Sequence, residues 1–253
     1  MAYEAMSWLV FALHGNQPRY VDGMVRNVEL IPRIYGPGWS AVVYHDHTVP
    51  GHILAQLRSS GLVALRPIGE TTRPSWAAYE GRFWRLLALE DPLIRKDHGA
   101  LVCHRDADSR ISSREVQAVM DWHISGHLVH IMRDHPHHTR RPLLAGMWDW
   151  RVSPNPARLA WIVEVADRYL QNLFQKAAAR PWGNDLFMGR WIYPKLRKVA
   201  LQHDTFGSRG LPFPGLTTPG PFVGEVVHVE GKLDKPYLPD REIRDKALRA
   251  RGK

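Results

Sequence analysis

Residues 104–110, HRDADSR, bring together side chains that could hold a metal ion against a phosphate. Asp106 and Asp108 lie two apart and follow the apolar run ALVC, which predicts a buried strand. In an extended loop, side chains two apart can point to the same side, so both carboxylates could share one hard cation, Mn²⁺ or Mg²⁺. The alternative is an exposed loop with ordinary salt bridges. The strand before the loop and a capped helix after it favour the metal site.

Arginines flank the acid pair and also occur in an earlier segment with helical spacing. Arg105 and Arg110 could face a substrate phosphate or balance the acids. Arg82 and Arg85 lie one turn apart, and either could pair with a diphosphate, or on a solvated face either would have little effect. We favour a role for Arg85 in binding the nucleotide.

The elements that must position these residues alternate between strands and helices. Strands are predicted within residues 7–15, 39–47, 62–69, 99–109 and 127–134, and helices within 20–38, 49–61, 75–92, 113–125 and 157–179. Ser112 with Glu115 fits a capping box at the start of the fourth helix, and Gly126 ends it. This alternation predicts an α/β fold with a mainly parallel sheet. In such a sheet, ligands bind beyond the carboxyl ends of the strands, where Asp106 and Asp108 would lie.

The length and composition of the chain predict one soluble domain with a basic surface. The 253 residues suffice for a sizeable core, and no apolar run approaches the roughly 20 residues that span a bilayer. Cys103 is the only cysteine, which excludes an internal disulfide and predicts a cytoplasmic protein, in the host cytoplasm if the source is viral. We expect a nucleotide-binding half over about 1–133, an irregular closing half over about 134–230, and a basic tail over 231–253.

Several segments together resemble a group of bacterial and viral glycosyltransferase-like proteins related to the GT-A nucleotide-sugar transferases. The resemblance covers about residues 7–225, is most specific over 104–150, and is carried by RDADSRISSREVQAV, HIMRDHPHH, LLAGMWDWR, YPKLRKVALQHDTF and PFPG…GPFVG. It implies a Rossmann-like sheet flanked by helices and a nucleotide-sugar donor, which we expect to be a UDP-sugar. It also implies that Asp106 and Asp108 are the acids of an Asp-x-Asp motif that holds Mn²⁺ or Mg²⁺ against the donor diphosphate.

The same resemblance assigns roles to residues later in the chain. His203 stands where many relatives place a late metal-binding histidine. Asp185 stands where the group often has Asp-Gln before an aromatic residue, although the order here is Asn-Asp-Leu-Phe. In such enzymes a metal ion and arginines stabilise the charge on the departing nucleoside diphosphate. If the acceptor hydroxyl needs a base, Asp134, Asp149 and Asp185 are the candidates, whereas a retaining mechanism could use none.

Further candidates lie in loops that would line the same pocket. His14 and Gly15 could cradle the nucleoside, and either Asp46 or His47 could lie near the nucleotide. These residues could equally be ordinary polar loop residues. No Walker-type or Gly-x-Gly-x-x-Gly pattern supports a P-loop enzyme or a dehydrogenase.

Aromatic and histidine-rich segments offer two more sets of candidates. Trp148, together with Trp150 beyond Gly146, could stack on a sugar or a base, or both rings could belong to the core. The histidines of the segment 135–138 could line the donor sugar or the acceptor, which we favour over a zinc site because the spacing matches no standard motif.

The net charge of +9 bears on the acceptor. We rank a hydroxymethylated base in double-stranded DNA slightly ahead of a cell-surface polysaccharide or lipid-linked glycan, because a basic surface and tail suit a polyanion. A basic face would also suit peripheral contact with an anionic membrane. The alternative of another class is a nucleic-acid-binding protein or nuclease without sugar chemistry. Against a nuclease, the sequence shows no second acidic cluster for a two-metal site.

Overall fold

A seven-stranded sheet organises the molecule in the computed structural model, which describes residues 6–79, 81–135, 138, 140–175, 184–207, 209–214 and 222–227. The strand order is β3-β2-β1-β4-β6-β5-β7. All neighbouring pairs are parallel except the two made by β6, which runs antiparallel to β4 and β5. The predicted α/β fold with a mainly parallel sheet is therefore confirmed. The strands are β1 Ser7–Leu13, β2 Trp39–His45, β3 Val63–Pro67, β4 Leu101–His104, β5 Val129–Arg133, β6 Trp148–Arg151 and β7 Ala200–Asp204.

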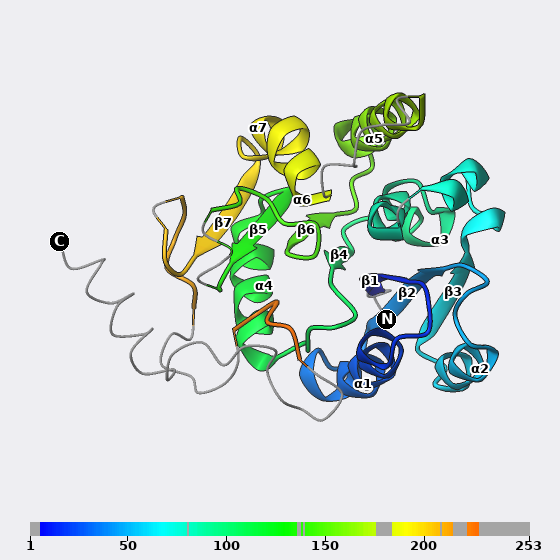
Figure 1. The fold of residues 1–253 in the computed structure, drawn as a ribbon. Helices are drawn as coiled ribbons and strands as arrows, with labels where there is room; N and C mark the ends of the chain where they lie inside the picture. Colours follow the sequence, from blue (N-terminus) through cyan, green and yellow to red (C-terminus); the bar gives the residue numbers. More distant parts are fainter. Residues whose placement is uncertain are drawn as a thin grey trace.

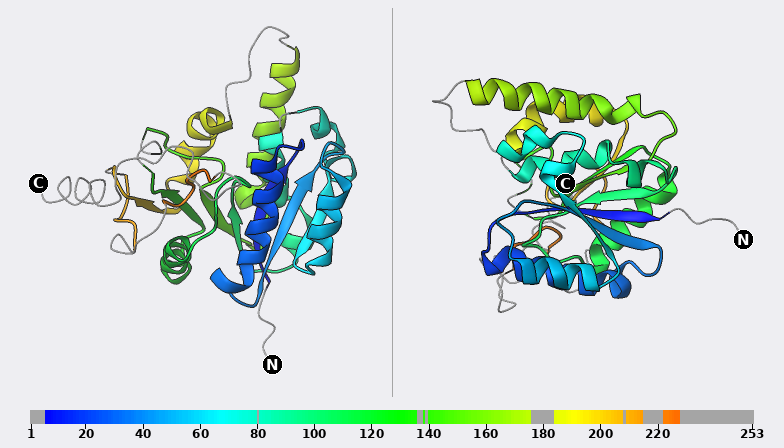
Figure 2. Two further views of the ribbon diagram at one scale, coloured as in Figure 1. Left: turned by 60° about the horizontal axis from the view of Figure 1, so that its bottom comes forward. Right: turned by 90° about the vertical axis from the view of Figure 1, so that its right-hand side faces the viewer.

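Helices cover both faces of this sheet (Figures 1 and 2). One face packs against α1 Pro18–Ile34, α2 Gly51–Ser59 and α4 Ser113–Ser125. The opposite face packs against the 3₁₀ segments η2 Pro74–Ala78 and η3 Gly81–Leu89, together with α5 Ala157–Gln175 and the chain of short helices α6 Asn184–Phe187, η4 Met188–Ile192 and α7 Tyr193–Leu196. Two smaller elements, η1 Ile68–Glu70 and α3 Pro92–Arg95, complete the set.

The alternation of side chains in β1 shows why the sheet needs both layers. Trp8 and Val10 lie in the core beneath η3 and α5, whereas Leu9 and Phe11 lie in the core beneath α1 and α2. A strand that is apolar on both faces must be covered on both faces. The nearly continuous apolar run of β1 therefore dictates a three-layer arrangement.

Three local predictions were wrong or incomplete. Residues 75–92 form two 3₁₀ segments rather than one α-helix, and the break falls immediately before Gly81, whose missing side chain leaves room for the His14 ring. Strands β6 and β7 were not predicted from the sequence. For β6 the reason is that the strand is short and gains its hydrogen bonds only from distant segments. The capping box is half formed: Ser112 accepts the Glu115 N–H at 3.3 Å, but the Glu115 side chain turns into the core.

The carboxyl ends of β1, β2, β4 and β5 lie at one edge of the sheet, because these strands are parallel. The segment that follows β4, residues 105–111, is called the carboxylate loop below. Residues from the far end of the described chain cross it: Val226 forms an antiparallel bridge with Ser109, and the Val227 N–H donates to Asp108 O at 2.8 Å. None of the described helices has the length and apolarity needed to cross a membrane.

Candidate functional site

A cavity of about 520 Å³ lies at the carboxyl edge of the sheet, beside the carboxylate loop. Its size is that of a typical small-molecule site. Six residues named from the sequence line it: His14, Arg82, Arg85, Asp106, Asp108 and Asp185. The remaining lining residues are Ala12, Tyr20, Ala107, Ala145, Asn184 and Val226.

The two loop carboxylates face this cavity with different exposure. The Asp106 side chain is 46% exposed and accepts a hydrogen bond from Arg85 Nη1 at 2.6 Å. The Asp108 side chain is only 12% exposed, and Arg19 Nε lies 3.5 Å from its Oδ2. Burial, and after it the neighbouring Asp106 carboxylate, raises the pKa of Asp108 above its ordinary value. The two carboxylates therefore repel each other when both are charged, and a cation in the cavity would relieve that repulsion.

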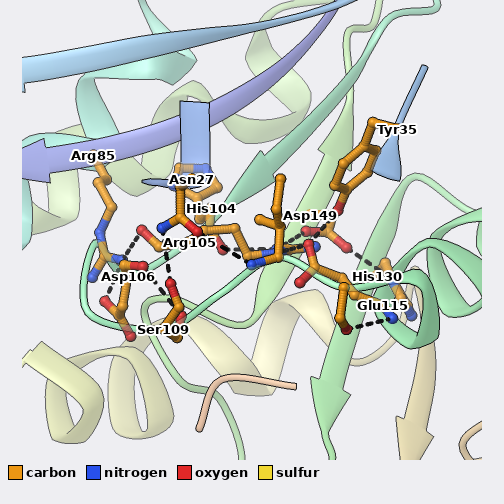
Figure 3. A network of polar contacts seen from close by, with 12 residues as sticks. Asn27, Tyr35, Arg85, His104, Arg105, Asp106, Ser109, Glu115, His130 and Asp149 are labelled. Atoms are coloured by element: carbon orange, nitrogen blue, oxygen red, sulfur yellow. Dashed lines mark hydrogen bonds and ion pairs between the residues drawn. The ribbon is translucent and has the colours of Figure 1, made fainter. Parts of the chain in front are cut away.

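Four hydrogen bonds, made by Arg85 and Asn27, fix the path of the carboxylate loop (Figure 3). Arg85 Nη1 donates both to Asp106 and to Arg105 O, the latter at 2.8 Å. Farther along, Asn27 Nδ2 donates to Ser109 O at 2.8 Å. Its Oδ1 accepts the Ile111 N–H at 3.3 Å. Asn27 belongs to α1 and is fully buried, so this helix sets the position of the loop's second half.

Two glycines allow the backbone of neighbouring segments to lie close against the carboxylate loop. A Cβ at Gly23 of α1 would overlap Ala107 O, and a Cβ at Gly146 would lie 2.5 Å from Asp106 Cγ. Both positions lack the positive backbone φ that would itself require glycine. Space alone therefore favours glycine here, because the loop is packed between α1 and the segment before β6.

The two carboxylates fit a divalent cation of the Mg²⁺ or Mn²⁺ type. Both present hard oxygen ligands to one cavity, and such ions are commonly bound by one or two carboxylates plus substrate phosphates and water. Within the described ranges no group of three or more His, Cys, Asp or Glu side chains could hold a metal ion. An ion here would therefore need donor phosphate and water oxygens to complete its shell.

The opposite wall of the cavity is made by the start of α6. Asp185 Oδ2 lies 2.6 Å from Arg141 Nη1, and its Oδ1 accepts the Ala145 N–H at 3.0 Å. Asn184 Nδ2 donates to Arg82 O at 2.6 Å, whereas its buried Oδ1 has no hydrogen-bond partner in the described part of the chain. That orphaned acceptor lies at the cavity wall and suits a hydroxyl or amide donor of a ligand.

The loop after β1 forms a third wall, and only part of it reaches the cavity. His14 lines the cavity and meets the Trp84 ring edge-on, with 5.9 Å between ring centroids. The Gly15 N–H donates to Thr48 Oγ1 at 2.6 Å, and Thr48 Oγ1 lies 2.5 Å from Asp46 Oδ1. Gly15 (φ 73°) and Asp46 are thus not lining residues; they brace the loop that carries His14.

Two of the acids predicted as candidate bases are buried away from the cavity. Asp149 of β6 is fully buried between Arg105 Nη1 at 2.5 Å and His130 Nδ1 at 2.7 Å. Burial alone would raise its pKa, but Arg105 and then His130 lower it below the ordinary value. Asp134 is also fully buried and pairs with Arg114 through both oxygens, at 2.6 and 2.7 Å. Both acids stabilise the core, and only Asp185 of the three meets the cavity.

Arg105 and Trp148 are also core residues rather than cavity residues. Arg105 is 2% exposed and forms ion pairs with Glu115 Oε1, at 2.6 Å, and with Asp149. Trp148 is fully buried and stacks on His104, with ring centroids 4.4 Å apart. Neither can touch a ligand in the cavity described above. The sequence could not show this, because the partners come from α4, β4 and β6.

His203 does not join the two loop carboxylates. It lies on β7, three strands from β4, where it is buried and its Nδ1 lies 2.8 Å from His130 Nε2. Burial, and next the neighbouring His130, lowers the pKa of His203 to about 3. The structure therefore places it in a core hydrogen-bond chain and not at the predicted metal site.

The remaining sequence candidates fall into two groups. Arg110 Nη1 donates to Ala107 O and Ser109 O, at 3.1 and 3.0 Å, and so braces the carboxylate loop. His135 and His138 lie next to each other, with ring centroids 5.1 Å apart, and neither lines the cavity. His137 and the tail 231–253 lie outside the described residues.

Asn27 is the clearest functional residue that the sequence reading missed. A signal was present: it is a polar residue on the apolar face of α1, between Met24, Val28 and Ile31. A buried amide must find partners, so its position predicts a hydrogen-bonded neighbour. Tyr20 and Asn184 were also missed as lining residues, and they carry no comparable signal.

Comparison with known proteins adds the fold and no more. No protein-family model matches the sequence, and no curated protein matches it. The galactosyltransferase LgtC, solved with donor and acceptor sugar analogues, superposes with a TM-score of 0.54 at 14% identity, over 96% of this chain and 95% of that chain. An active-site mutant of LgtC gives 0.53 at 11% identity over the same shares. The chain thus has the GT-A type of fold seen in this glycosyltransferase.

Proposed function

We propose that the protein is a metal-dependent glycosyltransferase that moves a sugar from a nucleotide-sugar donor to a hydroxyl acceptor. The observation that carries the proposal is the carboxylate pair Asp106 and Asp108, which faces a ligand-sized cavity at the carboxyl edge of a GT-A type sheet. Arg82 and Arg85 line the same cavity and supply positive charge for a diphosphate. LgtC, which shares this fold, was solved with donor and acceptor sugar analogues.

Asp106 and Asp108 would hold Mn²⁺ or Mg²⁺, which when bound neutralises the charge that develops on the departing nucleoside diphosphate. Arg85 holds Asp106 in place at 2.6 Å and adds a second positive charge beside the diphosphate. His14 and Tyr20 lie at the end of the cavity formed by β1 and α1, where they bound the space for the nucleoside. A UDP-sugar remains our prediction for the donor.

Asp185 is the acid that we assign to the sugar side of the cavity. Its ion pair with Arg141 and its bond from the Ala145 N–H stabilise the charged carboxylate. A carboxylate held in this way suits acceptance of a hydrogen bond from a sugar or acceptor hydroxyl. We therefore propose an orienting role for Asp185, with Asn184 Oδ1 as a second acceptor beside it.

A thermal-shift screen tests the proposal. The full chain is heated with a panel of sugar nucleotides in the presence and absence of Mn²⁺. A ligand at about 100 times its Kd stabilises the fold by roughly 2.7 kcal/mol. We expect stabilisation by at least one sugar nucleotide, and only with the metal ion.

Two variants connect that stabilisation to the site. Asp106→Asn and Asp108→Asn should each abolish the metal-dependent shift and the metal-dependent hydrolysis of the donor. Asp121→Asn, which changes an exposed carboxylate on α4 outside the cavity, is the matched control and should behave like the wild type. Wild-type hydrolysis by Asp108→Asn would refute the assignment.

The acceptor is a separate question with two alternatives. A hydroxymethylated DNA base is supported by the charge of +9, and a polysaccharide or lipid-linked glycan is the alternative. The assay incubates duplex DNA containing hydroxymethylated cytosine or uracil with the active donor and Mn²⁺, followed by mass analysis of the nucleosides. If the enzyme consumes donor and no base gains a sugar mass, the DNA acceptor is refuted. Cleavage of the DNA without donor turnover would instead indicate a nuclease.

A further inference from the structure

The helical segment from Asn184 to Leu196 has one face in the core and one in solvent. It comprises α6, the π-helical turn η4 and α7 without interruption. Its buried face consists of Phe187, Met188, Ile192 and Leu196, which belong to the core that also contains η3 and α5. Tyr193 connects it to β7, because its hydroxyl lies 3.2 Å from Gln202 Oε1, and Figure 1 shows α6 and α7 near that strand. The segment is therefore rigidly anchored.

Outside its buried face, the segment exposes two large apolar side chains. Trp191 is 51% exposed and Leu186 is 42% exposed. Single exposed apolar side chains are normal on a protein surface, whereas several of them together on one surface mark interaction sites. The burial of the inner face shows that neither side chain is needed to complete the core.

The exposed part of the same segment is strongly basic. Residues 186–198 contain Arg190, Lys195, Arg197 and Lys198 and no acidic residue. All four are exposed, and none forms a salt bridge with any carboxylate of the described residues. Instead, two of them lie over aromatic rings: Arg190 is 5.9 Å from the centre of the Trp191 ring, and Lys195 Nζ is 4.4 Å from that of Trp161.

We propose that this face, called the basic–aromatic face below, docks on the surface of an anionic lipid membrane. Trp is suited to the headgroup level of a bilayer, where its ring is half-buried, and Leu186 can enter beside it. Lys and Arg around them are attracted to anionic headgroups. A nucleic acid would match the basic residues but leave Leu186 in water. A membrane surface satisfies both the apolar and the basic members of the face.

The location of the basic–aromatic face also bears on the acceptor, and this step of the inference rests on the proposed glycosyltransferase function. Asn184 and Asp185 begin the same helical segment and line the cavity. A membrane against Leu186 and Trp191 would therefore lie beside the sugar side of the cavity. That placement favours an acceptor whose hydroxyl is presented at a lipid surface, which is the glycan alternative above.

Vesicle sedimentation tests docking without any enzymatic assay. The full-length chain is mixed with vesicles of phosphatidylcholine alone, or of equimolar phosphatidylcholine and phosphatidylglycerol. We expect binding to the anionic vesicles only. The double variant Lys195→Gln/Lys198→Gln should bind them roughly 25-fold more weakly, since each basic residue near such a surface contributes roughly a factor of five. The double variant Leu186→Ser/Trp191→Ser should lose at least about tenfold through lost apolar burial.

Matched controls lie on the opposite layer of the molecule. Met120→Ser/Ile124→Ser removes two exposed apolar side chains from α4, and Arg33→Gln/Arg58→Gln removes two exposed basic ones from α1 and α2. Both controls should bind the anionic vesicles as the wild type does. Equal losses in the controls and in the variants of the basic–aromatic face would refute the proposal.

Two other outcomes would also overturn it. If the wild type ignores anionic vesicles while Lys195→Gln/Lys198→Gln weakens binding to duplex DNA, the face is a nucleic-acid site. If deletion of 241–253 removes vesicle binding and the face variants bind normally, the tail carries the interaction. Metal-dependent donor hydrolysis without vesicles should be at the wild-type rate in all face variants. A failure of docking is therefore distinguishable from a failure of the proposed glycosyltransferase activity.

Discussion

Replacement of Gly146 by Ala should displace the Asp106 carboxylate and thereby weaken metal binding, with a modest loss of stability. A Cβ at this position would lie 2.5 Å from Asp106 Cγ and 2.8 Å from its Oδ1. Ordinary van der Waals contact begins at 3.4 Å, so the carboxylate must move by about 0.9 Å. The backbone at Gly146 does not have a positive φ, so Ala adds no backbone strain.

The two consequences of this shift differ in size. Misplacement of a catalytic group by about 1 Å can cost roughly 100-fold in rate, so we expect a loss of about that order in metal-dependent donor turnover. The Arg85–Asp106 pair would also break. The Asp106 side chain is 46% exposed, but the Arg85 side chain is only 5% exposed and keeps just its bond to Arg105 O, so we expect a loss of stability of about 1–3 kcal/mol.

The assay combines a Mn²⁺ titration of donor hydrolysis with thermal unfolding in the absence of metal. Gly51→Ala is the control, because a Cβ at the first residue of α2 meets no atom within 4 Å. It should retain wild-type turnover and unfold at the same temperature or a little higher. The reasoning is refuted if Gly146→Ala requires no more Mn²⁺ than the wild type and turns over donor at the same rate.

Three further variants test the supports of the site. Asn27→Ala removes both hydrogen bonds that hold the second half of the carboxylate loop; we expect a loss of about 1–3 kcal/mol in denaturant unfolding and a weaker response to Mn²⁺. Arg105→Met leaves the buried Glu115 and Asp149 without their cation and should cost about 3–5 kcal/mol, while nucleotide affinity of the folded protein stays near the wild-type value. Because burial lowers the pKa of His203 to about 3, the folded state keeps it neutral while the unfolded state takes up a proton below pH of about 6.5. Stability present above pH 6.5 should then fall by about 1.4 kcal/mol per unit as the pH drops toward 3, and His203→Gln should remove that slope. A pH profile unchanged in His203→Gln would contradict the burial argument.

The sequence by itself determined the local features of this protein. The apolar runs of β1, β2 and β4 predict buried strands, and α4 begins after Ser112 and ends before Gly126 as its capping residues indicate. The alternation of strands and helices also predicts the parallel sheet and therefore the edge at which ligands bind. Asp106 and Asp108 follow a strand at that edge, so their place beside the cavity was predictable.

Only the tertiary structure decided which of the remaining polar residues reach the cavity. Asp134, Asp149 and Asp185 look alike in sequence, since each follows or interrupts an apolar segment. The short strand β6 pairs antiparallel with both β4 and β5, and this carries Asp149 into the core beside Arg105. Asp134 pairs in the core with Arg114 from α4, whereas Asp185 lies in the first turn of α6, which forms part of the cavity wall. The physical reason is that a side chain's exposure depends on partners that lie tens of residues away, and no local pattern specifies those partners.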